Sequence, residues 1–238
     1  MKKAIVVGAS SGIGRELAKV LAEQGYVVGV MARREHLLNT LREEIHGECF
    51  VQTIDIADAA SAMKTLGDFI TTMGGVDLVV LSAGTGDLNE SLDWELEREA
   101  IQTNVVGFAA LANVAMQHFL GKGSGHLVSF SSLASLRGGR ACPAYNASKA
   151  FESNYMEGLR QKVKHARLSI TITDLKLGFV QTAMAKGEGL FWVAPVDKAV
   201  RQIYDAIKKK KSGAYVTRRW RLIAWLLKAM PSALYEKL

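Results

Sequence analysis

A tyrosine and a lysine four residues apart, Tyr145 and Lys149, suit acid–base chemistry by their types and spacing. Two residues at this spacing share one face of a helix, so the phenol and the ammonium group would lie close together. A free phenol, with a pKa near ~10, exchanges protons poorly at neutral pH, but a neighbouring ammonium favours the phenolate and lowers that pKa. We therefore expect Tyr145 to donate or accept a proton. A core tyrosine and an unrelated surface lysine give the same spacing, so further residues must support this interpretation.

A glycine-rich turn follows the first apolar run of the chain. Residues 8–14 read Gly-Ala-Ser-Ser-Gly-Ile-Gly and lie between a predicted strand and a predicted helix. A strand that turns tightly into a helix directs free backbone N–H groups at one point, where a pyrophosphate can bind, and glycine permits its close approach. An ordinary glycine-rich turn is the alternative for the motif alone. Its position between strand and helix favours dinucleotide binding.

The end of the second apolar run indicates which dinucleotide is preferred. Residues 31–34 read Met-Ala-Arg-Arg. An acidic residue at this place would accept hydrogen bonds from the ribose 2′-hydroxyl of NAD, whereas a guanidinium can bind a 2′-phosphate through two hydrogen bonds. Arg33 and Arg34 therefore predict NADP(H) as the preferred cofactor. NAD(H) binding, with arginines that only cap the strand, stays the alternative.

These motifs occur together with other short segments in a fixed order. The segments are Gly8 to Gly14, Asp55-Ile56, Ser82-Ala83-Gly84, Asn104, Ser132, Tyr145, Lys149 and Gly178 to Thr182. In this combination the sequence resembles the short-chain dehydrogenase/reductase family over nearly its whole length. The resemblance is specific because the pieces match jointly.

The resemblance implies a role for each candidate catalytic residue. Tyr145 would donate a proton to the carbonyl oxygen during reduction, and Ser132 would hydrogen-bond that oxygen. Lys149 would hold the nicotinamide ribose and lower the pKa of the phenol. Asn104 would help to hold a water that relays protons to Lys149.

Cofactor contacts follow from the glycine turn, the arginines and the resemblance together. Asp55 would meet the adenine and Ile56 would pack on it. The residues expected to bind the cofactor are Gly8, Ser10, Ser11, Gly12, Ile13, Gly14, Arg33, Arg34, Asp55, Ile56, Ser82, Ala83, Gly84, Tyr145, Lys149, Val180 and Thr182.

Two positions depart from the family pattern. Ser82 stands where the family usually has asparagine, and Leu177 stands where it usually has proline before the glycine. Neither position belongs to the proton-transfer groups, so we expect activity to persist. Ser132 is the last serine at the strand end and its separation from Tyr145 fits the family, so the resemblance makes it the catalytic candidate. Strand alternation directs Ser129 and Ser131 away from the side on which Ser132 lies.

Short apolar runs alternate along the chain with stretches of roughly 3.6-residue periodicity. Strands separated by helices need crossover connections, which favour a parallel sheet covered on both faces. We therefore expect an α/β fold with a doubly wound, Rossmann-like parallel sheet. The predicted strands are residues 4–7, 26–31, 49–54, 77–81, 126–130, 169–175 and 214–217, and two predicted helices are residues 15–24 and 35–46.

The chain length fits one large domain. We expect residues 1–217 to form the catalytic domain and residues 218–238 to extend it as a basic, amphipathic C-terminal tail that contains an amphipathic helix. Residues 197–238 hold 11 Lys or Arg and 3 Asp or Glu, which gives this segment a charge of +8. Since the net charge of the chain is +7, the remaining residues carry −1. The basic character thus belongs to the end of the chain.

This C-terminal segment and the loop before it have two interpretations each. Residues 218–230 are too short and too charged to span a bilayer, but they could lie in the headgroup region with Trp220 and Trp225 at the interface. Packing as a lid or between subunits is the alternative. Residues 183–192 are expected to form a lid with apolar side chains over a hydrophobic substrate, or to pack on the body.

We therefore predict an NADP(H)-dependent oxidoreductase that moves a hydride between nicotinamide and a carbonyl or secondary alcohol. A dinucleotide-binding regulator without turnover is the alternative. No metal is expected because the histidines lack metal-ligand spacing, and nucleic-acid binding is not expected because the basic residues lack recognition motifs. A thiolate is not expected at Cys142, three residues before Tyr145.

Composition and the resemblance also set expectations for location and assembly. The two cysteines fit a reducing, cytoplasmic compartment, with peripheral membrane contact as an option. Residues 100–121 carry no charged side chain, but their polar side chains indicate a buried or interfacial helix and not a membrane span. The resemblance implies a homodimer or homotetramer formed through residues 100–121 and 144–164.

Overall fold

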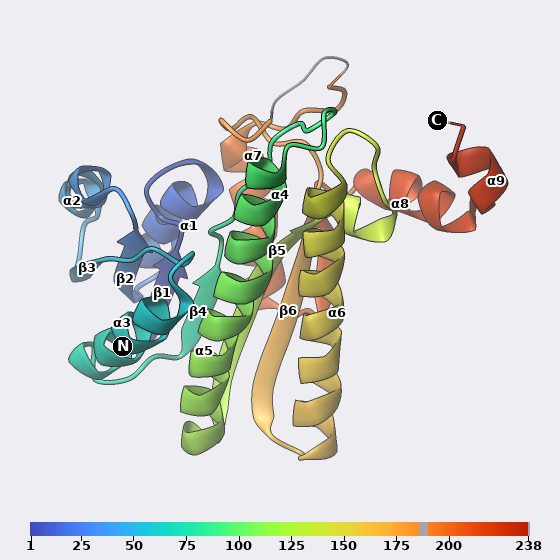
Figure 1. Ribbon diagram of the computed structural model, residues 1–238. Helices are drawn as coiled ribbons and strands as arrows, with labels where there is room; N and C mark the ends of the chain where they lie inside the picture. Colours follow the sequence, from blue (N-terminus) through green and yellow to red (C-terminus); the bar gives the residue numbers. More distant parts are fainter. Residues whose placement is uncertain (186–189, 238) are drawn as a thin grey trace.

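A seven-stranded parallel sheet forms the centre of the computed structural model, which describes residues 1–185 and 190–237. The strand order is β3-β2-β1-β4-β5-β6-β7, so the chain runs outward from β1 in one direction and then from β4 in the other (Figure 1). The strands are β1 (Lys3–Val7), β2 (Val27–Ala32), β3 (Cys49–Thr53), β4 (Leu78–Leu81), β5 (Ser124–Ser132), β6 (Ser169–Leu177) and β7 (Gly213–Val216). The predicted doubly wound α/β fold is confirmed.

Helices cover both faces of the sheet (Figure 1). The predicted helices at residues 15–24 and 35–46 are present with slightly different ends. The helices are α1 (Gly12–Glu23), α2 (Glu35–Glu44), α3 (Ala59–Thr72), α4 (Trp94–Ile101), α5 (Phe108–Lys122), α6 (Pro143–His165), α7 (Val196–Lys208), α8 (Trp220–Ala229) and α9 (Ser232–Tyr235).

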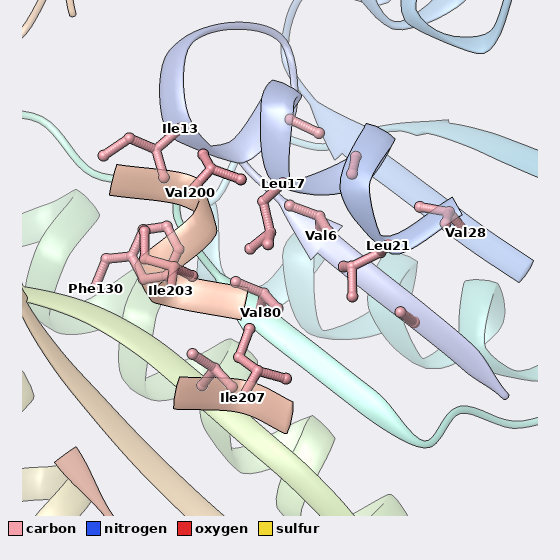
Figure 2. Packing of buried hydrophobic residues seen from close by; sticks show 14 of the residues in the cluster. Val6, Ile13, Leu17, Leu21, Val28, Val80, Phe130, Val200, Ile203 and Ile207 are labelled. Carbon is pink, nitrogen blue, oxygen red and sulfur yellow. The ribbon is translucent and has the colours of Figure 1, made fainter. Parts of the chain in front are cut away.

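Strand alternation divides the core into two apolar layers. Val6 of β1 belongs to one layer, with Leu17 of α1 and Ile203 of α7, and Figure 2 shows these side chains converging. Ile5 of the same strand belongs to the other layer, with Phe119 of α5. Successive strand residues point to opposite faces, so a strand buried on both sides must be apolar throughout. This explains why the predicted strands are continuous apolar runs.

The stretch 100–121, expected as one helix, changes its winding along its length. It begins at the end of α4, continues as a π-helical segment over Gln102–Gly107 and then enters α5. At Gly107, a Cβ atom would lie 2.1 Å from the carbonyl oxygen of Ile56, so only glycine lets the helix pass the end of β3 this closely. Single π-helical turns often mark functional positions, and this one contains Asn104.

The C-terminal helix α8 packs on the body through one face. Trp220 is only 3% exposed, so the expectation that it would sit at a membrane interface is wrong, because its ring is enclosed by residues of the preceding loop. Trp225, on the opposite face, is 72% exposed. Among the described residues, no helix is long and apolar enough to span a membrane.

Candidate active site

The glycine turn between β1 and α1 is shaped by backbone approaches that a side chain would block. Gly8 has a φ of +93°, and a Cβ there would lie 2.5 Å from the backbone nitrogen of Ala83. A Cβ at Gly14 would lie 2.3 Å from the carbonyl oxygen of Gly8. The turn is therefore folded tightly against the end of β4.

The N-terminus of α1 is suited to an anion. Ser11 precedes the helix, but its side chain does not cap it, and the first turn holds no acidic residue. The first N–H groups of a helix need an acceptor and carry the positive end of the helix dipole. These residues thus fit the pyrophosphate of a dinucleotide.

Arg34 is held against this turn. Its Nη2 atom donates hydrogen bonds to the hydroxyl oxygens of Ser10 and Ser11, each at 2.8 Å. The guanidinium group is thereby placed at the end of β2 beside the glycine turn, although the side chain stays exposed. Arg33 is also exposed and lines the same cavity.

A cavity of about 1950 Å³ runs along the carboxyl ends of the strands. Parallel strands end at one edge of the sheet, so the loops that follow them meet there. Of the residues predicted to bind cofactor or to catalyse, only Asn104 does not line this cavity. The sheet therefore brings the rest of the predicted site together.

The two residues that the resemblance places near the adenine, Asp55 and Ile56, follow β3. Ile56 is buried, whereas Asp55 is exposed and its carboxylate accepts a hydrogen bond of 3.0 Å from the backbone nitrogen of Ala57. Thr182 lies near the glycine turn, since a Cβ at Gly12 would be 3.2 Å from its methyl group. The segments after β3 and β6 thus border the same cavity as the turn after β1.

Ser132, Tyr145 and Lys149 come from two neighbouring elements. Ser132 ends β5, and its hydroxyl accepts a hydrogen bond from the backbone nitrogen of Ala134 at 3.1 Å. Tyr145 and Lys149 lie one turn apart in α6, with the lysine Nζ 5.9 Å from the centre of the tyrosine ring. The three side chains line one cavity, as the sequence predicts.

The neighbouring serines have other partners. Ser131 donates a hydrogen bond to the buried carboxylate of Asp174, and the hydroxyl of Ser129 is buried without a partner among the described residues. Cys142 also lines the cavity, and burial raises the pKa of its thiol. This favours the thiol form, in agreement with the expectation that Cys142 is not a thiolate.

Asn104 is fully buried and forms hydrogen bonds with Thr85 and Ser148. Its amide oxygen accepts from the backbone nitrogen of Thr85 at 2.9 Å, and its amide nitrogen donates to the Thr85 carbonyl at 2.7 Å and to the Ser148 hydroxyl at 3.0 Å. A Cβ at Gly84 would lie 3.2 Å from both the Asn104 oxygen and Lys149 Nζ. Asn104 thus fixes the loop after β4 beside the lysine.

Two residues of the site escaped the sequence reasoning. Gly86 is one, because a Cβ there would lie 2.3 Å from the ring of Tyr145, so the loop backbone rests directly on that ring. Glu152 is the other, because its carboxylate pairs with Lys149 at 2.8 Å. Spacing along α6 places Glu152 one turn from Lys149, but only the structure shows that both are buried.

Burial and pairing act against each other on these two groups. Burial is the largest single influence on Lys149 and favours its neutral form, but Glu152, with smaller contributions from Tyr145 and Asp174, outweighs burial and raises the lysine pKa above its ordinary value. Burial raises the pKa of Glu152 to about 7, against the lowering effect of Lys149. The lysine therefore stays an ammonium ion at neutral pH.

Aromatic rings enclose the far end of the cavity. Trp220 of α8 lies 5.5 Å from Phe179, 5.1 Å from Phe191 and 5.6 Å from Trp192, measured between ring centres. A Cβ at Gly178 would lie 2.1 Å from the indole nitrogen of Trp220. The predicted lid, 183–192, therefore packs against the C-terminal helix where it is described; residues 186–189 of that lid lie outside the described part.

No cluster of potential metal ligands occurs among the described residues. His126, for example, is buried and pairs with the hydroxyl of Thr173 at 2.8 Å.

Comparison with known proteins agrees with this geometry. Residues 2–190 match the family model described as short chain dehydrogenase. An oxidoreductase from Myxococcus xanthus is 32% identical, over 99% of this chain and 95% of that protein. The mouse protein dehydrogenase/reductase SDR family member 7B is 26% identical, over 90% of this chain and 72% of that protein.

Solved structures share the fold. A short-chain type dehydrogenase/reductase from Mycobacterium marinum superposes with a TM-score of 0.81 at 20% identity, over 90% of this chain and 93% of that one. An alcohol dehydrogenase from the archaeon Thermococcus sibiricus, complexed with 5-hydroxy-NADP, superposes with a TM-score of 0.79 at 24% identity, over 90% of this chain and 95% of that one. The family model and the relatives lead to one conclusion: the chain belongs to the short-chain dehydrogenase/reductase family and is an oxidoreductase of that type.

Proposed function

We propose that this protein is an NADP(H)-dependent oxidoreductase that moves a hydride between nicotinamide and a carbonyl or secondary alcohol of a hydrophobic substrate. The observation that carries this proposal is the single cavity shared by Tyr145, Ser132 and Lys149 with the glycine turn and Arg34. One end of the cavity is lined by the residues that we expect to bind the dinucleotide, and the other end is lined by aromatic rings.

The side chains of this site would manage the proton. When bound, the dinucleotide supplies or accepts the hydride. Ser132 would donate a hydrogen bond to the substrate oxygen, and Tyr145 would give that oxygen its proton as the carbonyl carbon becomes a carbinol. Lys149 would hold the ribose and stabilise the phenolate that the proton transfer leaves behind. In the oxidative direction each proton moves the opposite way.

Replacement of the phenol tests this proposal. Tyr145→Phe removes the proton donor and keeps the ring, so turnover with a panel of apolar aldehydes and ketones should fall by about 100- to 10 000-fold. NADPH binding, followed by fluorescence, should stay within a few-fold of the wild-type value. A wild-type protein that binds NADPH without turning over any substrate would favour the regulator without activity.

The preference for NADP(H) rests on Arg34. Its guanidinium is held at the glycine turn by Ser10 and Ser11, and we expect it to pair there with a 2′-phosphate. Arg34→Ala should lower kcat/KM for NADPH by about 10- to 100-fold, the effect of one lost charge-assisted pair, and leave kcat/KM for NADH nearly unchanged. Arg42→Ala, an exposed arginine in the following helix, is the matched control. An equal loss with both cofactors would contradict the assignment.

Contact of α8 with a membrane surface is a further part of the proposal. Trp220 and Ala224 are buried on its inner face, whereas Leu222 and Trp225 are 69% and 72% exposed on the outer one. Figure 1 shows α8 and α9 extending past α6 at the border of the molecule. Basic side chains beside an exposed apolar helix face favour binding to anionic lipid.

Not every basic residue of the segment is available for lipid. Arg218 pairs with Asp205, and Arg219 donates to the backbone oxygen of Trp192. Arg221 and Lys228 flank Trp225 along α8 at spacings of four and three residues, so they share one stripe of the helix with it. They are the residues that we expect to meet lipid phosphates.

Flotation of the full chain with vesicles tests the contact. Binding to vesicles that contain anionic phospholipid should weaken strongly in Trp225→Ser, whereas Met63→Ser, at an exposed apolar position of α3, should bind like wild type. Equal flotation of both variants would exclude this surface. Truncation at Thr217 is a poorer test, because it also removes Trp220 from the aromatic cluster.

Assembly into a homodimer or homotetramer through α5 and α6 is the remaining part of the proposal. Ile101 and Val106, just before α5, are partly exposed apolar side chains in keeping with an interface there. Light scattering of the purified chain, with Val106→Glu as the disrupting variant, measures it directly. A monomer at micromolar concentration would contradict it.

A further inference from the structure

A buried carboxylate stands next to the lysine of the proposed active site. Glu152 lies one turn after Lys149 in α6 and is 2% exposed. Both of its oxygens contact Lys149 Nζ, at 2.8 and 3.0 Å, and the same nitrogen donates to the carbonyl of Phe130 at 3.2 Å. The ammonium group is thus fixed from two elements, α6 and β5.

The other charged group that faces Glu152 already has its own partner. Asp174 of β6 is buried, accepts hydrogen bonds from Ser131 and Ser153, and pairs with Lys176. Its charge is therefore offset locally. On α6 itself, Glu152 is faced by Lys149, and Lys149 in turn by Tyr145. Glu152 is hence the carboxylate in contact with Lys149 and the main group that offsets its charge, with a smaller contribution from Asp174.

The pairing of Lys149 with Glu152 weakens the effect of the lysine on the ionisation of the Tyr145 phenol. An isolated ammonium favours the phenolate, whereas an ammonium paired with a carboxylate favours it less. Seven residues of helix separate Glu152 from Tyr145, a rise of about 10 Å. At that separation a full charge in a partly buried site shifts the ionisation of a second group by about one pH unit.

We propose that Glu152 is a positioning residue that acts through Lys149: its carboxylate holds the ammonium in place and offsets its charge, which disfavours the Tyr145 phenolate and sets the site for reduction. The inference concerns the ionisation of residues in this chain, and its link to reduction rests on the proposed function. The raised pKa of Glu152, about 7, limits the offset to pH values near and above neutrality, because the carboxyl group is protonated below.

Titration of the phenol tests this proposal without any turnover. The tyrosinate absorbance that is absent from Tyr145→Phe reports residue 145. In Glu152→Gln, which keeps the size and a hydrogen-bond acceptor but removes the charge, this transition should move to lower pH by about one unit. Glu157→Gln makes the same change at an exposed position of the same helix and should leave the transition in place.

A second variant separates charge from packing. Glu152→Asp keeps the charge and shortens the side chain, so its transition should stay near the wild-type pH, even if thermal unfolding shows a looser fold. If the role of Glu152 is purely structural, Glu152→Asp and Glu152→Gln should shift the tyrosinate transition alike, or neither variant should shift it. Either of those results would overturn the proposal.

Turnover supplies an independent readout. The high-pH loss of carbonyl reduction, where the proton donor is exhausted, should begin about one pH unit lower in Glu152→Gln, and alcohol oxidation should gain at the same pH. If the absorbance shifts as expected but no substrate is turned over, the proposed function fails and the role of Glu152 stands. If turnover occurs but the transition does not move, only the role of Glu152 fails.

Discussion

The two ends of the cavity are built in different ways. The end that we propose for the dinucleotide is formed by backbone approaching backbone, as where a Cβ at Gly14 would lie 2.3 Å from the Gly8 carbonyl oxygen. The end that we propose for the substrate is formed by rings, as where Trp220 of α8 packs against Phe179 and Phe191 from the loop after β6. The glycine turn at the first end is specified by residues that are close in sequence, whereas the aromatic cluster at the second end is specified by contacts between distant segments. We therefore expect the first end to tolerate almost no added atoms. A substitution at the second end should change only the packing around it.

A single added methyl group should break the dinucleotide end. In Gly14→Ala the methyl would meet the Gly8 carbonyl, so the turn must shift, and a displacement of this kind costs about 100-fold in a positioned site. We expect NADPH affinity to fall by at least that factor. Gly67→Ala in α3 is the matched control: its Cβ meets nothing within 4 Å, and it should stabilise the fold by about 0.5–1 kcal/mol. Normal NADPH binding by Gly14→Ala would contradict the account of the turn.

Removal of Trp220 should instead loosen the substrate end alone. Trp220→Ala should lower the free energy of unfolding by about 3–5 kcal/mol and raise KM for an apolar substrate, with NADPH affinity nearly unchanged. Gly178→Ala should cost about 1–3 kcal/mol by overpacking, because its Cβ would lie 2.1 Å from the indole nitrogen.

Chemical denaturation of both single variants and the double variant measures the coupling. In the Trp220→Ala background the cost of Gly178→Ala should largely disappear, since the ring that it meets is gone. Strictly additive costs would show that the two residues do not share this contact.

A buried histidine away from both ends affects stability only as the pH falls. Burial lowers the pKa of His126 from 6.5 to about 4. The folded state therefore favours the neutral ring, and this contribution, about 3 kcal/mol, is present above pH 6.5 and is lost as the pH falls from 6.5 towards 4. In His126→Gln the free energy of unfolding should lose this part of its pH dependence, measured by denaturation at pH 7 and pH 4.5. A variant with the wild-type slope would contradict it.

Glu152 acts on stability with the opposite sign over a similar pH range. Its pKa in the folded state is raised, so the folded state holds the proton more tightly, and stability falls as the pH rises from about 4.5 to about 7. Glu152→Gln should therefore show a steeper gain in stability with rising pH than wild type does.

The difference between the two ends also explains how much the sequence could predict. The sheet, the glycine turn and the strand-end residues follow from local patterns, because parallel strands bring their carboxyl ends to one edge whatever the detailed packing. Arg34 was predicted from its place after a strand, and its hydrogen bonds to Ser10 and Ser11 add the reason for its position.

Residues defined by long-range packing could not be predicted in this way. Nothing local distinguishes Trp220, which is buried, from Trp225, which is exposed five residues later in the same helix. Glu152 has the spacing of an ordinary helical ion pair, and its proposed role follows from its burial beside Lys149. Gly86 matters because the ring of Tyr145 lies on it, a contact between separate segments.

Transfer of an isotope label tests the central claim most directly. NADPH carrying deuterium at the transferable position of its nicotinamide is mixed with the protein and an apolar ketone, and the alcohol is analysed by mass spectrometry. The wild-type protein should place one deuterium on the carbinol carbon, whereas Tyr145→Phe should bind NADPH and form the labelled alcohol at least about 100-fold more slowly. Labelled alcohol formed equally fast without the phenol would contradict the account.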